Sequence, residues 1–381
     1  MIYLDNAATT MRKPPEVLAA VKNAYNTFGG PGRGSHGAAM RAADAMYACR
    51  EAACELFGLS NPERVVLTLN ATHALNIAIK SLAKPGRKVL VSGFEHNAVM
   101  RPLHVLQQRG VMFEVLDTPL FRPDAAVSAF ENALDDSVCL AVCTHVSNVF
   151  GCILPVERIA KLCREKNVPL IIDASQSAGI LPVNQSKLHG AAICASGHKG
   201  LYGPQGTGLL LVGDTALSSL IEGGTGSGSI SLEMPKDLPD ALEAGTPNAW
   251  GAAGLCEGIK FVLRKGTDEI EHIEHELLDH CAMLLHDIKG VKYYYYTPVQ
   301  TGVMSMVFVS EEHDVEDIAS KLSENGVAVR AGLQCAPIAH KTAGTLPYGT
   351  LRVSFSCFST RSEVRTFAKT LESAMTANTS L

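Results

Sequence analysis

Short apolar segments alternate with longer amphipathic segments over the first two thirds of the chain. Several of the short segments are apolar at nearly every position, which is typical of strands buried on both faces of a parallel sheet. The predicted strands are Arg64–Thr68, Lys88–Ser92, Val111–Val115, Ser137–Thr144, Leu170–Ile172, Ala191–Ala195 and Gly208–Val212. The predicted helices are one that begins near Pro15, one that ends at Gln108, and Ala38–Phe57, Ala74–Leu82 and Pro155–Lys166. This alternation predicts an α/β fold with a mainly parallel, seven-stranded sheet and right-handed crossovers.

The pattern of apolar and polar positions changes after about Gly266, and the regular alternation of strand and helix ends there. The predicted elements there are the helices Asp268–His286, Glu316–Glu324 and Ser362–Met375 and the strands Val303–Val309, Val327–Arg330 and Leu351–Phe355. Helices over a small sheet indicate a separate α+β unit. We therefore expect a large domain over residues 15–265 and a small C-terminal domain over residues 266–381, with residues 1–14 packing on the small domain.

The composition is typical of a soluble enzyme. The 381 residues include 46% hydrophobic and 19% charged residues, the net charge is −5, and no basic stripe occurs, so we do not expect a nucleic-acid partner. No apolar run is long enough to span a membrane and the N-terminus lacks the pattern of a signal peptide, so we expect a cytoplasmic protein without a membrane partner. The eleven cysteines include no CxxC pair and are odd in number, which argues against a disulfide framework or a zinc ribbon.

Two of the predicted strands end in residues that can carry chemistry. Asp173 directly follows Leu170–Ile172, and Lys199 closely follows Ala191–Ala195. The carboxyl ends of the strands form the ligand-binding edge of an open α/β sheet. A lysine at this edge can form a Schiff base with pyridoxal phosphate (PLP), and an acid can keep the pyridine nitrogen protonated. The alternative is a buried Asp–Lys ion pair with a purely structural role.

The neighbouring strand ends carry further polar residues, each with an ordinary structural alternative. Thr72 and the amides of its helical turn could bind a phosphate, or Thr72 could be an N-cap. His96 could stack on a cofactor ring and transfer protons with a pKa near the working pH, or be a loop histidine. Asn148 and Gln176 could hydrogen-bond the phenolic oxygen of PLP or cap their loops, and Ser196 could supply a second phosphate hydroxyl.

The motifs together point to a known family, and they run in order along nearly the whole chain. They are Tyr3–Thr10, Glu95–Asn97, Asp173–Gln176, Ser196–Lys199, Gly245–Asn248 and an Arg-x-Gly-x-x-Cys sequence over Arg330–Cys335. This combination resembles the class V PLP-dependent enzymes and, among them, the cysteine desulfurases (NifS/SufS-like, with a short cysteine loop). The resemblance implies PLP-dependent fold type I and a homodimer with its active sites near the subunit interface.

The resemblance also implies roles for the strand-end residues. Lys199 would hold PLP as a Schiff base, Asp173 would pair with the pyridine nitrogen, and His96 would stack on the ring. Thr72, Ser196 and His198 would hold the phosphate, and Thr246 would reach the phosphate in the site of the other subunit. Ala71 and His73 are further residues expected to bind the cofactor. His73 stands where many relatives have an acid, which would alter the packing of the ring face.

The small domain would supply the residues that act on the substrate. Cys335 matches the nucleophilic cysteine of the family. Arg352 matches the arginine that binds the substrate carboxylate, a task suited to its planar guanidinium; a surface strand arginine is the alternative. Arg330, Asn148 and His36 are further candidate substrate ligands. His36 belongs to a glycine-rich loop over residues 29–37, which could bring Arg33 or His36 to a pocket.

The cysteine loop departs from many relatives in one position. They have a histidine directly before the cysteine, where this chain has Gln334, so the activation of the thiol stays open. Only 17 positions separate Cys335 from Arg352. A loop this short resembles that of desulfurases that often pass sulfur to a dedicated acceptor.

These observations predict a PLP-dependent cysteine desulfurase that converts L-cysteine to L-alanine and holds the sulfur on Cys335 as a persulfide. A selenocysteine lyase would use the same residues, and a class V aminotransferase or another PLP lyase would use Lys199 without Cys335. A non-enzymatic scaffold is disfavoured by the presence of Lys199. The stretch Glu271–His280 is rich in His and Glu, but His275 and His280 lack the i, i+4 spacing of an HExxH motif, so we expect no metal.

Overall fold

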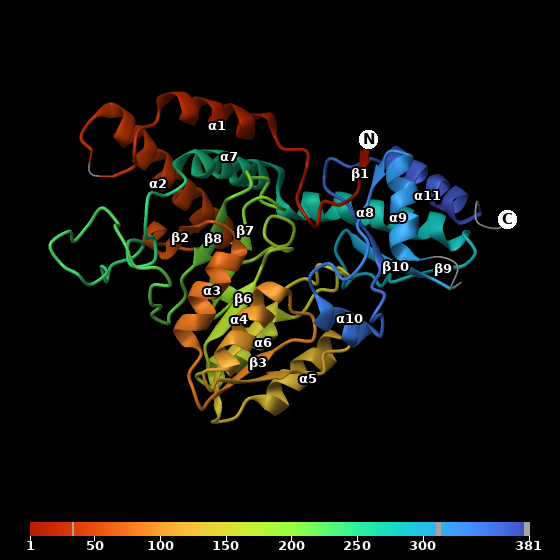
Figure 1. Ribbon diagram of the computed structural model, residues 1–381, viewed down its shortest axis with the longest axis horizontal. Helices are drawn as coiled ribbons and strands as arrows, with labels where there is room; N and C mark the ends of the chain where they lie inside the picture. The colour runs from red at the N-terminus through yellow and green to blue at the C-terminus, as the bar shows by residue number, and fades with distance from the viewer. Residues whose placement is uncertain (33, 310–313, 377–381) are drawn as a thin grey trace.

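The computed structural model describes residues 1–32, 34–309 and 314–376, so Arg33 lies outside the described residues. Its largest sheet has seven strands in the order β2-β8-β7-β6-β5-β3-β4 (Figure 1). The strands are β2 Val65–Thr68, β3 Lys88–Val91, β4 Met112–Val115, β5 Val138–Thr144, β6 Leu170–Asp173, β7 Ala192–Ser196 and β8 Gly208–Leu211. Strand β8 runs in the opposite direction to the other six strands, which confirms the predicted mainly parallel sheet.

Helices cover both faces of this sheet, and each face has its own hydrophobic core. The helices of this part are α1 Pro15–Thr27, α2 Gly37–Phe57, α3 Ala71–Leu82, α4 Asn97–Gln107, α5 Pro123–Ala133, α6 Val156–Glu165 and α7 Ala249–Lys265. Side chains of α2, α5, α6 and α7 pack on one face. Those of α3 and α4 pack on the other. Because β5, β6 and β7 are covered on both sides, they are apolar at nearly every position.

The C-terminal part is built on a three-stranded antiparallel sheet in the order β12-β10-β9. The strands of this sheet are β9 Val291–Tyr293, β10 Val303–Phe308 and β12 Leu351–Ser354, and β11 Val327–Ala328 lies outside it. The helices of this part are α8 Thr267–His286, α9 Val315–Glu324, α10 Pro337–Ala343 and α11 Arg361–Thr376. Gly266 lies between α7 and α8, where the sequence predicts a domain boundary.

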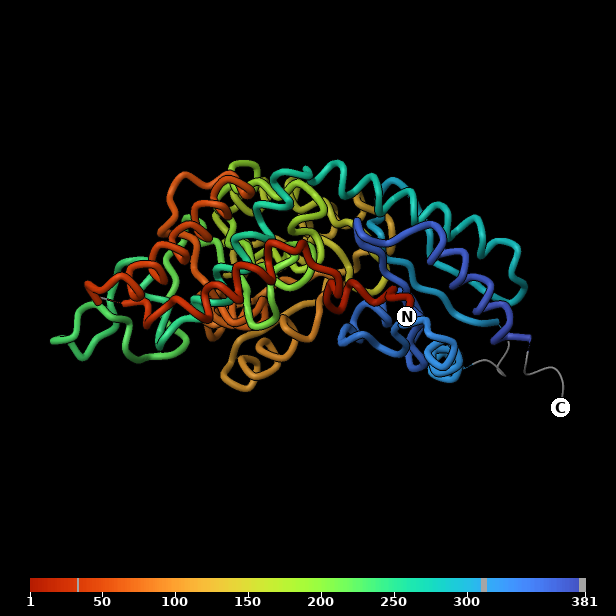
Figure 2. Tube along the Cα trace, turned by 90° about the horizontal axis from the view of Figure 1, so that it is seen from above, coloured from red at the N-terminus to blue at the C-terminus, as the bar shows by residue number. Residues whose placement is uncertain are grey.

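The N-terminal residues lie against this C-terminal part rather than against the large sheet. Strand β1, Ile2–Tyr3, pairs in parallel with β11, and Leu4 belongs to the same hydrophobic cluster as α8, α9 and α11. Figure 2 accordingly shows the N-terminus beside the C-terminal helices. The chain then crosses back toward the large sheet as residues 5–14, which places Asp5–Thr10 between the two parts.

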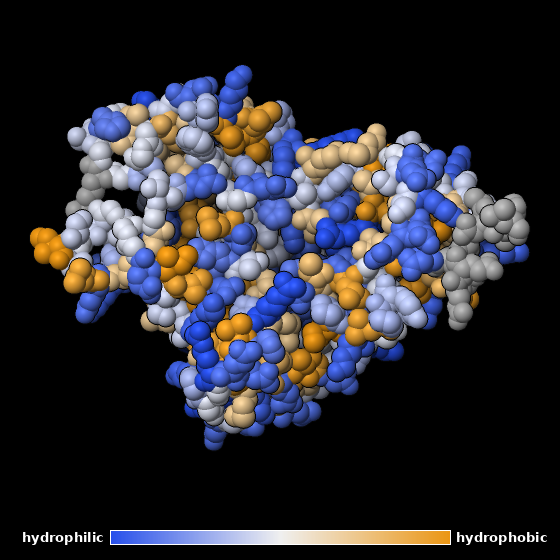
Figure 3. Space-filling model, viewed as in Figure 1, coloured by the Kyte–Doolittle hydropathy of each residue, from blue (hydrophilic) through white to orange (hydrophobic). Residues whose placement is uncertain are grey.

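A long loop between β8 and α7 projects from the opposite end of the molecule (Figure 2). Within this loop, Ile230 and Leu232 are fully exposed. Figure 3 shows apolar side chains at that edge of the molecule. No helix within the described ranges is both long and apolar enough to cross a membrane. Nine of the eleven cysteines are buried, Cys357 is half-buried and Cys335 is exposed.

Candidate active site

A cavity of about 210 Å³ opens at the carboxyl ends of β5, β6 and β7. Strand ends and the start of α3 supply its walls, as expected for a ligand site in an open α/β sheet. It is lined by Ala8, Asn70, Ala71, Thr72, His96, Ala98, Thr144, Val146, Asn148, Asp173, Ser175, Gln176, Ser196, His198 and Lys199. The structure therefore brings together eight of the residues predicted from separate motifs, and Ala71 with them.

Asp173 and Lys199 form the floor of this cavity. Asp173 is the last residue of β6 and is buried, and its Oδ1 accepts a hydrogen bond from the Ser175 amide at 2.9 Å. Burial lowers the pKa of Lys199 to about 8, although Asp173 opposes this effect. Near neutral pH Lys199 is therefore uncharged far more often than an ordinary lysine, and the uncharged amine is the form that condenses with an aldehyde.

His96 lies over the same cavity, but its protonation differs from the prediction. It is the N-cap of α4, and its Nδ1 accepts a hydrogen bond from the Ala98 amide at 3.0 Å. Burial lowers the pKa of His96 to about 4, so the expected pKa near the working pH is wrong for this structure. The imidazole is neutral, and its proton is on Nε2 because Nδ1 is an acceptor.

Hydroxyl groups, a histidine and a helix start surround one end of the cavity. The N-cap of α3 is Asn70, whose side chain accepts from the His73 amide at 2.9 Å, so Thr72 is not the cap. Helix α3 therefore begins at Ala71, three residues before the predicted start at Ala74, and turns its first amides toward the cavity. His198 contacts the Thr9 hydroxyl through Nδ1 at 3.0 Å, and burial lowers its pKa to about 4.

The two predicted amide side chains also hold neighbouring segments. Gln176 donates from Nε2 to the carbonyl of Ala7 at 2.9 Å, and Asn148 donates from Nδ2 to the carbonyl of Gln334 at 2.8 Å. Each amide nitrogen carries a second N–H that can serve a ligand. Gln176 and Asn148 thus join the cavity to the N-terminal segment and to the cysteine loop.

This donor set fits PLP. The buried carboxylate of Asp173 suits a protonated ring nitrogen, and the Lys199 amine suits the aldehyde. Thr72, Ser196 and the first amides of α3 suit a phosphate dianion at the other end. These groups lie in one cavity although they come from three separate parts of the chain.

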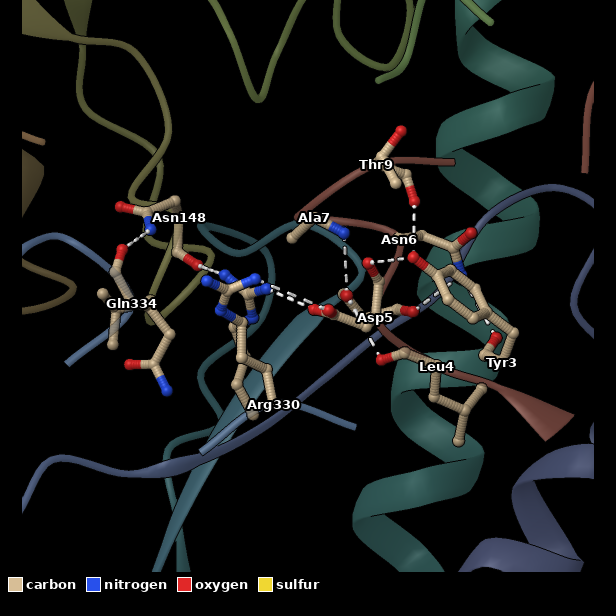
Figure 4. Close-up of polar contacts among 12 residues, drawn as sticks. Tyr3, Leu4, Asp5, Asn6, Ala7, Thr9, Asn148, Arg330 and Gln334 are labelled. Carbon is tan, nitrogen blue, oxygen red and sulfur yellow. Dashed lines mark hydrogen bonds and ion pairs between the residues drawn. The ribbon is translucent and has the colours of Figure 1, made fainter. Parts of the chain in front are cut away.

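Two arginines, Arg330 and Arg352, form ion pairs with Asp5. Figure 4 shows Arg330 and Asp5 on one side of Asn148, a residue of the cavity wall. The side chain of Arg352 is 2% exposed, which rules out a surface strand arginine. It donates from Nη2 to Asp5 Oδ1 at 2.5 Å and from Nη1 to the carbonyl of Asn148 at 2.8 Å. Its Nε is buried and has no hydrogen-bond partner among the described residues. The side chain of Arg330 is 45% exposed and lies 3.8 Å from Asp5 Oδ2.

Cys335 lies on the adjoining loop. It is exposed, and its backbone φ of +57° falls in the left-handed region, as does the +43° of Gln334. Its carbonyl accepts a hydrogen bond from the amide of Asn97 at 2.8 Å, and Asn97 directly follows His96 in the sequence. The cysteine loop is therefore tied to the residues that line the cavity.

Three predicted residues lie elsewhere. His36 is the N-cap of α2, and its Nδ1 accepts from the Ala39 amide at 3.4 Å. His73 and Thr246 line a neighbouring cavity of about 110 Å³ rather than the one that contains Lys199. A role for Thr246 in the partner subunit's site stays a prediction.

Sequence reasoning gave no role to Asp5 and Glu95, although both belong to the quoted motifs. Glu95 is fully buried, and its Oε1 accepts from the Ser92 hydroxyl at 2.5 Å and the Thr144 amide at 2.7 Å. Burial raises the pKa of Glu95 to about 8, so the carboxyl is largely protonated at neutral pH. Each of the two residues belongs to a motif that also contains cavity residues, and this position could have indicated a role for it.

The fold and this site define a PLP-dependent enzyme of fold type I. The chain belongs to the class V aminotransferase family, whose model matches residues 2–367.

Several proteins similar to this chain are named cysteine desulfurases. A probable cysteine desulfurase of Mycolicibacterium paratuberculosis is 31% identical over 97% of this chain, and the match spans 54% of that relative, or about half its length. A probable cysteine desulfurase of Xylella fastidiosa is 32% identical over 97% of this chain and 90% of the relative. The apo structure of a cysteine desulfurase from Thermococcus onnurineus has a TM-score of 0.90 at 29% identity, covering 99% of this chain and 95% of that one.

Proposed function

We propose that this protein is a cysteine desulfurase that releases L-alanine from L-cysteine and keeps the sulfur on Cys335. The observation that carries this proposal is an exposed cysteine on a loop whose carbonyls accept hydrogen bonds from Asn97 and from Asn148, a residue that lines the Lys199 cavity. Two relatives with this architecture bear the same name. An aminotransferase would have no use for an exposed thiol at this position.

Lys199 would hold the cofactor and then transfer protons at the substrate. When bound, PLP withdraws electron density from the substrate Cα. Asp173 would keep the ring nitrogen protonated, and the neutral His96 would cover the ring face. Because the pKa of Lys199 is about 8, its amine can accept the Cα proton near neutral pH.

Cys335 would receive the sulfur. Its thiolate attacks the substrate sulfur, a sulfur–sulfur bond forms, and the substrate Cβ–S bond breaks with its electron pair remaining on carbon. Protonation of that carbon and return of the Cα proton from Lys199 complete alanine. The persulfide would then pass to a thiol on an acceptor protein, since the exposed position of Cys335 leaves it accessible.

The arginine pair would bind the substrate carboxylate. Arg330 is partly exposed, and Arg352 keeps a buried Nε without a partner in the described part of the chain, so both retain donors for a second carboxylate. Asp5 would hold the two guanidinium groups side by side. Asn148, which already contacts Arg352 and lines the cavity, would complete this subsite.

The test is alanine formation from L-cysteine by the purified PLP-loaded protein with a reductant. We expect Cys335→Ala to lose at least 100-fold in rate, whereas Cys357→Ala, the matched control at the half-buried cysteine, keeps the parent rate. Full activity of Cys335→Ala would overturn the role of the thiol. Keto-acid formation with an amino acceptor, and no alanine from cysteine, would instead identify an aminotransferase.

A further inference from the structure

The backbone that presents Cys335 is strained over two consecutive residues. Gln334 and Cys335 have φ values of +43° and +57°, which side-chain-bearing residues rarely adopt. Such a conformation persists only where surrounding contacts hold it. The contacts of this loop therefore show what fixes the orientation of the thiol.

The side chain of Gln334 makes the first set of contacts. It is buried although the next residue is exposed, and its Nε2 donates to the carbonyl of Thr350 at 2.9 Å. Its Oε1 lies 2.9 Å from Nε2 of His340, which is also fully buried. Gln334 is thus held between Thr350, which directly precedes β12, and His340 of α10.

His340 can donate to Gln334 in only one tautomer. Burial lowers the pKa of His340 to about 4, so its ring is neutral at neutral pH. Because Gln334 Oε1 is an acceptor, the ring proton lies on Nε2, and Nδ1 accepts from the Thr345 hydroxyl at 2.7 Å. The three hydrogen bonds therefore run in one direction: Thr345 donates to His340, His340 donates to Gln334, and Gln334 donates to the carbonyl of Thr350.

The backbone of the loop makes the second set of contacts. The carbonyl of Gln334 accepts from Asn148 Nδ2 at 2.8 Å, and the carbonyl of Cys335 accepts from the Asn97 amide at 2.8 Å. Asn148 lines the cofactor cavity, and Asn97 lies between His96 and Ala98, which also line it. The loop is therefore held from the cavity side through its carbonyls and from the small sheet through the Gln334 side chain.

We propose that Gln334 and His340 form a clamp that positions the Cys335 thiol for sulfur transfer. Its catalytic consequence rests on the proposed function. Gln334 does not titrate and its side chain is committed to His340 and Thr350, so it acts through orientation rather than as an acid or base. A clamped loop also means that the acceptor thiol approaches Cys335, and Cys335 does not swing out to reach it.

The test compares substitutions in the clamp with a buried glutamine outside it. We expect Gln334→Ala to lower kcat for alanine and the single-turnover rate of persulfide formation on Cys335 by 10- to 100-fold. The KM for L-cysteine and the visible absorbance of bound PLP should stay within twofold of the parent. His340→Leu should behave like Gln334→Ala, whereas His340→Gln, which keeps a donor at the Nε2 position, should retain most of the rate.

Gln300→Ala is the matched control. Gln300 is fully buried and donates from Nε2 to the carbonyls of Phe150, Tyr294 and Val303, so its loss also removes buried hydrogen bonds. We expect it to lower thermal stability without changing kcat. Hydrogen exchange at the amides of residues 332–336 should accelerate in Gln334→Ala and not in Gln300→Ala.

These readouts separate failure of the clamp from failure of the proposed function. The clamp is overturned if Gln334→Ala loses stability but keeps both the kcat of the parent and the parent's rate of amide hydrogen exchange at residues 332–336. Equal losses in His340→Gln and His340→Leu would also overturn it. A parent protein that makes no alanine contradicts the proposed function, while the exchange measurement still reports on the clamp.

Discussion

At the scale of single residues, Asp5 supplies the counter-charge that allows the guanidinium of Arg352 to be buried. A guanidinium with 2% of its side chain exposed has almost no contact with water, so it needs a counter-charge. Asp5 supplies this charge at 2.5 Å and lies close to Arg330 as well. Burial lowers the pKa of Arg352 and Asp5 opposes that shift.

We expect Asp5→Asn to lower the free energy of unfolding by about 3 kcal/mol, because it leaves a buried guanidinium without its counter-charge. The control is Asp124→Asn, which removes an ion pair with Arg158 whose side chains are 88% and 54% exposed, respectively. That change should stay within about 0.5 kcal/mol. Urea denaturation of both variants measures the difference, and equal effects would show that Arg352 does not depend on Asp5.

At the scale of helices and strands, the amphipathic and apolar patterns predicted most elements of the sheet within a few residues. They gave no signal for α7, whose sequence contains Gly251, Gly254 and Gly258. Glycine is unfavourable in an isolated helix. Here it allows close packing: a Cβ at Gly258 would lie 2.2 Å from the carbonyl oxygen of Leu201. The helical conformation of α7 is therefore favoured by tertiary contacts, which a local sequence pattern does not contain.

The cavity residues were predictable because each follows a strand whose end the pattern locates. Helix α10 was not, since its seven residues are too few for a helical period to stand out. The ion pair between Asp5 and Arg352 joins residues at opposite ends of the chain. It depends on the pairing of β1 with β11, and no local property of either residue indicates that pairing.

Helix α8 carries a buried acid that links stability to pH. Glu274 is 2% exposed, and burial raises its pKa to about 8 from an ordinary value of 4.5. Between these two values the folded protein binds more protons than the unfolded chain, so stability falls as pH rises from about 4.5 through 8. Glu95, with a pKa of about 8, acts in the same direction.

We therefore expect Glu274→Gln to flatten part of this dependence, because glutamine has no proton to lose. The parent should lose several kcal/mol more than the variant between pH 5 and pH 8, since one pKa unit corresponds to about 1.4 kcal/mol. The measurement is the urea midpoint of both proteins at these two pH values. Parallel pH profiles would contradict a protonated Glu274 in the folded protein.

At the scale of the whole molecule, the proposed active site draws on both ends of the chain. The large sheet supplies the cofactor cavity, and the C-terminal part supplies Cys335, Arg330 and Arg352. Residues 5–10 connect them: Ala7 accepts from Gln176 at 2.9 Å, and its amide donates to Ser354 Oγ at 2.8 Å. We propose that residues 15–265 and 266–381 are two domains held together across the site by this segment.

We also predict a homodimer in which Thr246 reaches the phosphate in the partner subunit's site. Lys199→Ala and Thr246→Ala would then impair different components of each site. Mixed dimers would contain one site with both residues intact, so mixing the two variants should restore up to about half of the parent activity per mixed dimer. Sedimentation should give twice the 40.5 kDa mass of the chain.

An absence of recovery in mixed dimers that sedimentation shows to have formed would place Thr246 outside the partner's site. A monomeric parent protein would contradict the dimer itself.

If the Lys199 cavity and Cys335 form one sulfur-transferring site, sulfur from L-cysteine must appear on Cys335. Mass spectrometry of Cys335 after brief turnover of L-cysteine without reductant measures this transfer. We predict a gain of one sulfur atom on the peptide that contains Cys335, together with alanine, and no such gain in Lys199→Ala. Alanine formation without sulfur on Cys335, or a persulfide on another cysteine, would contradict the account.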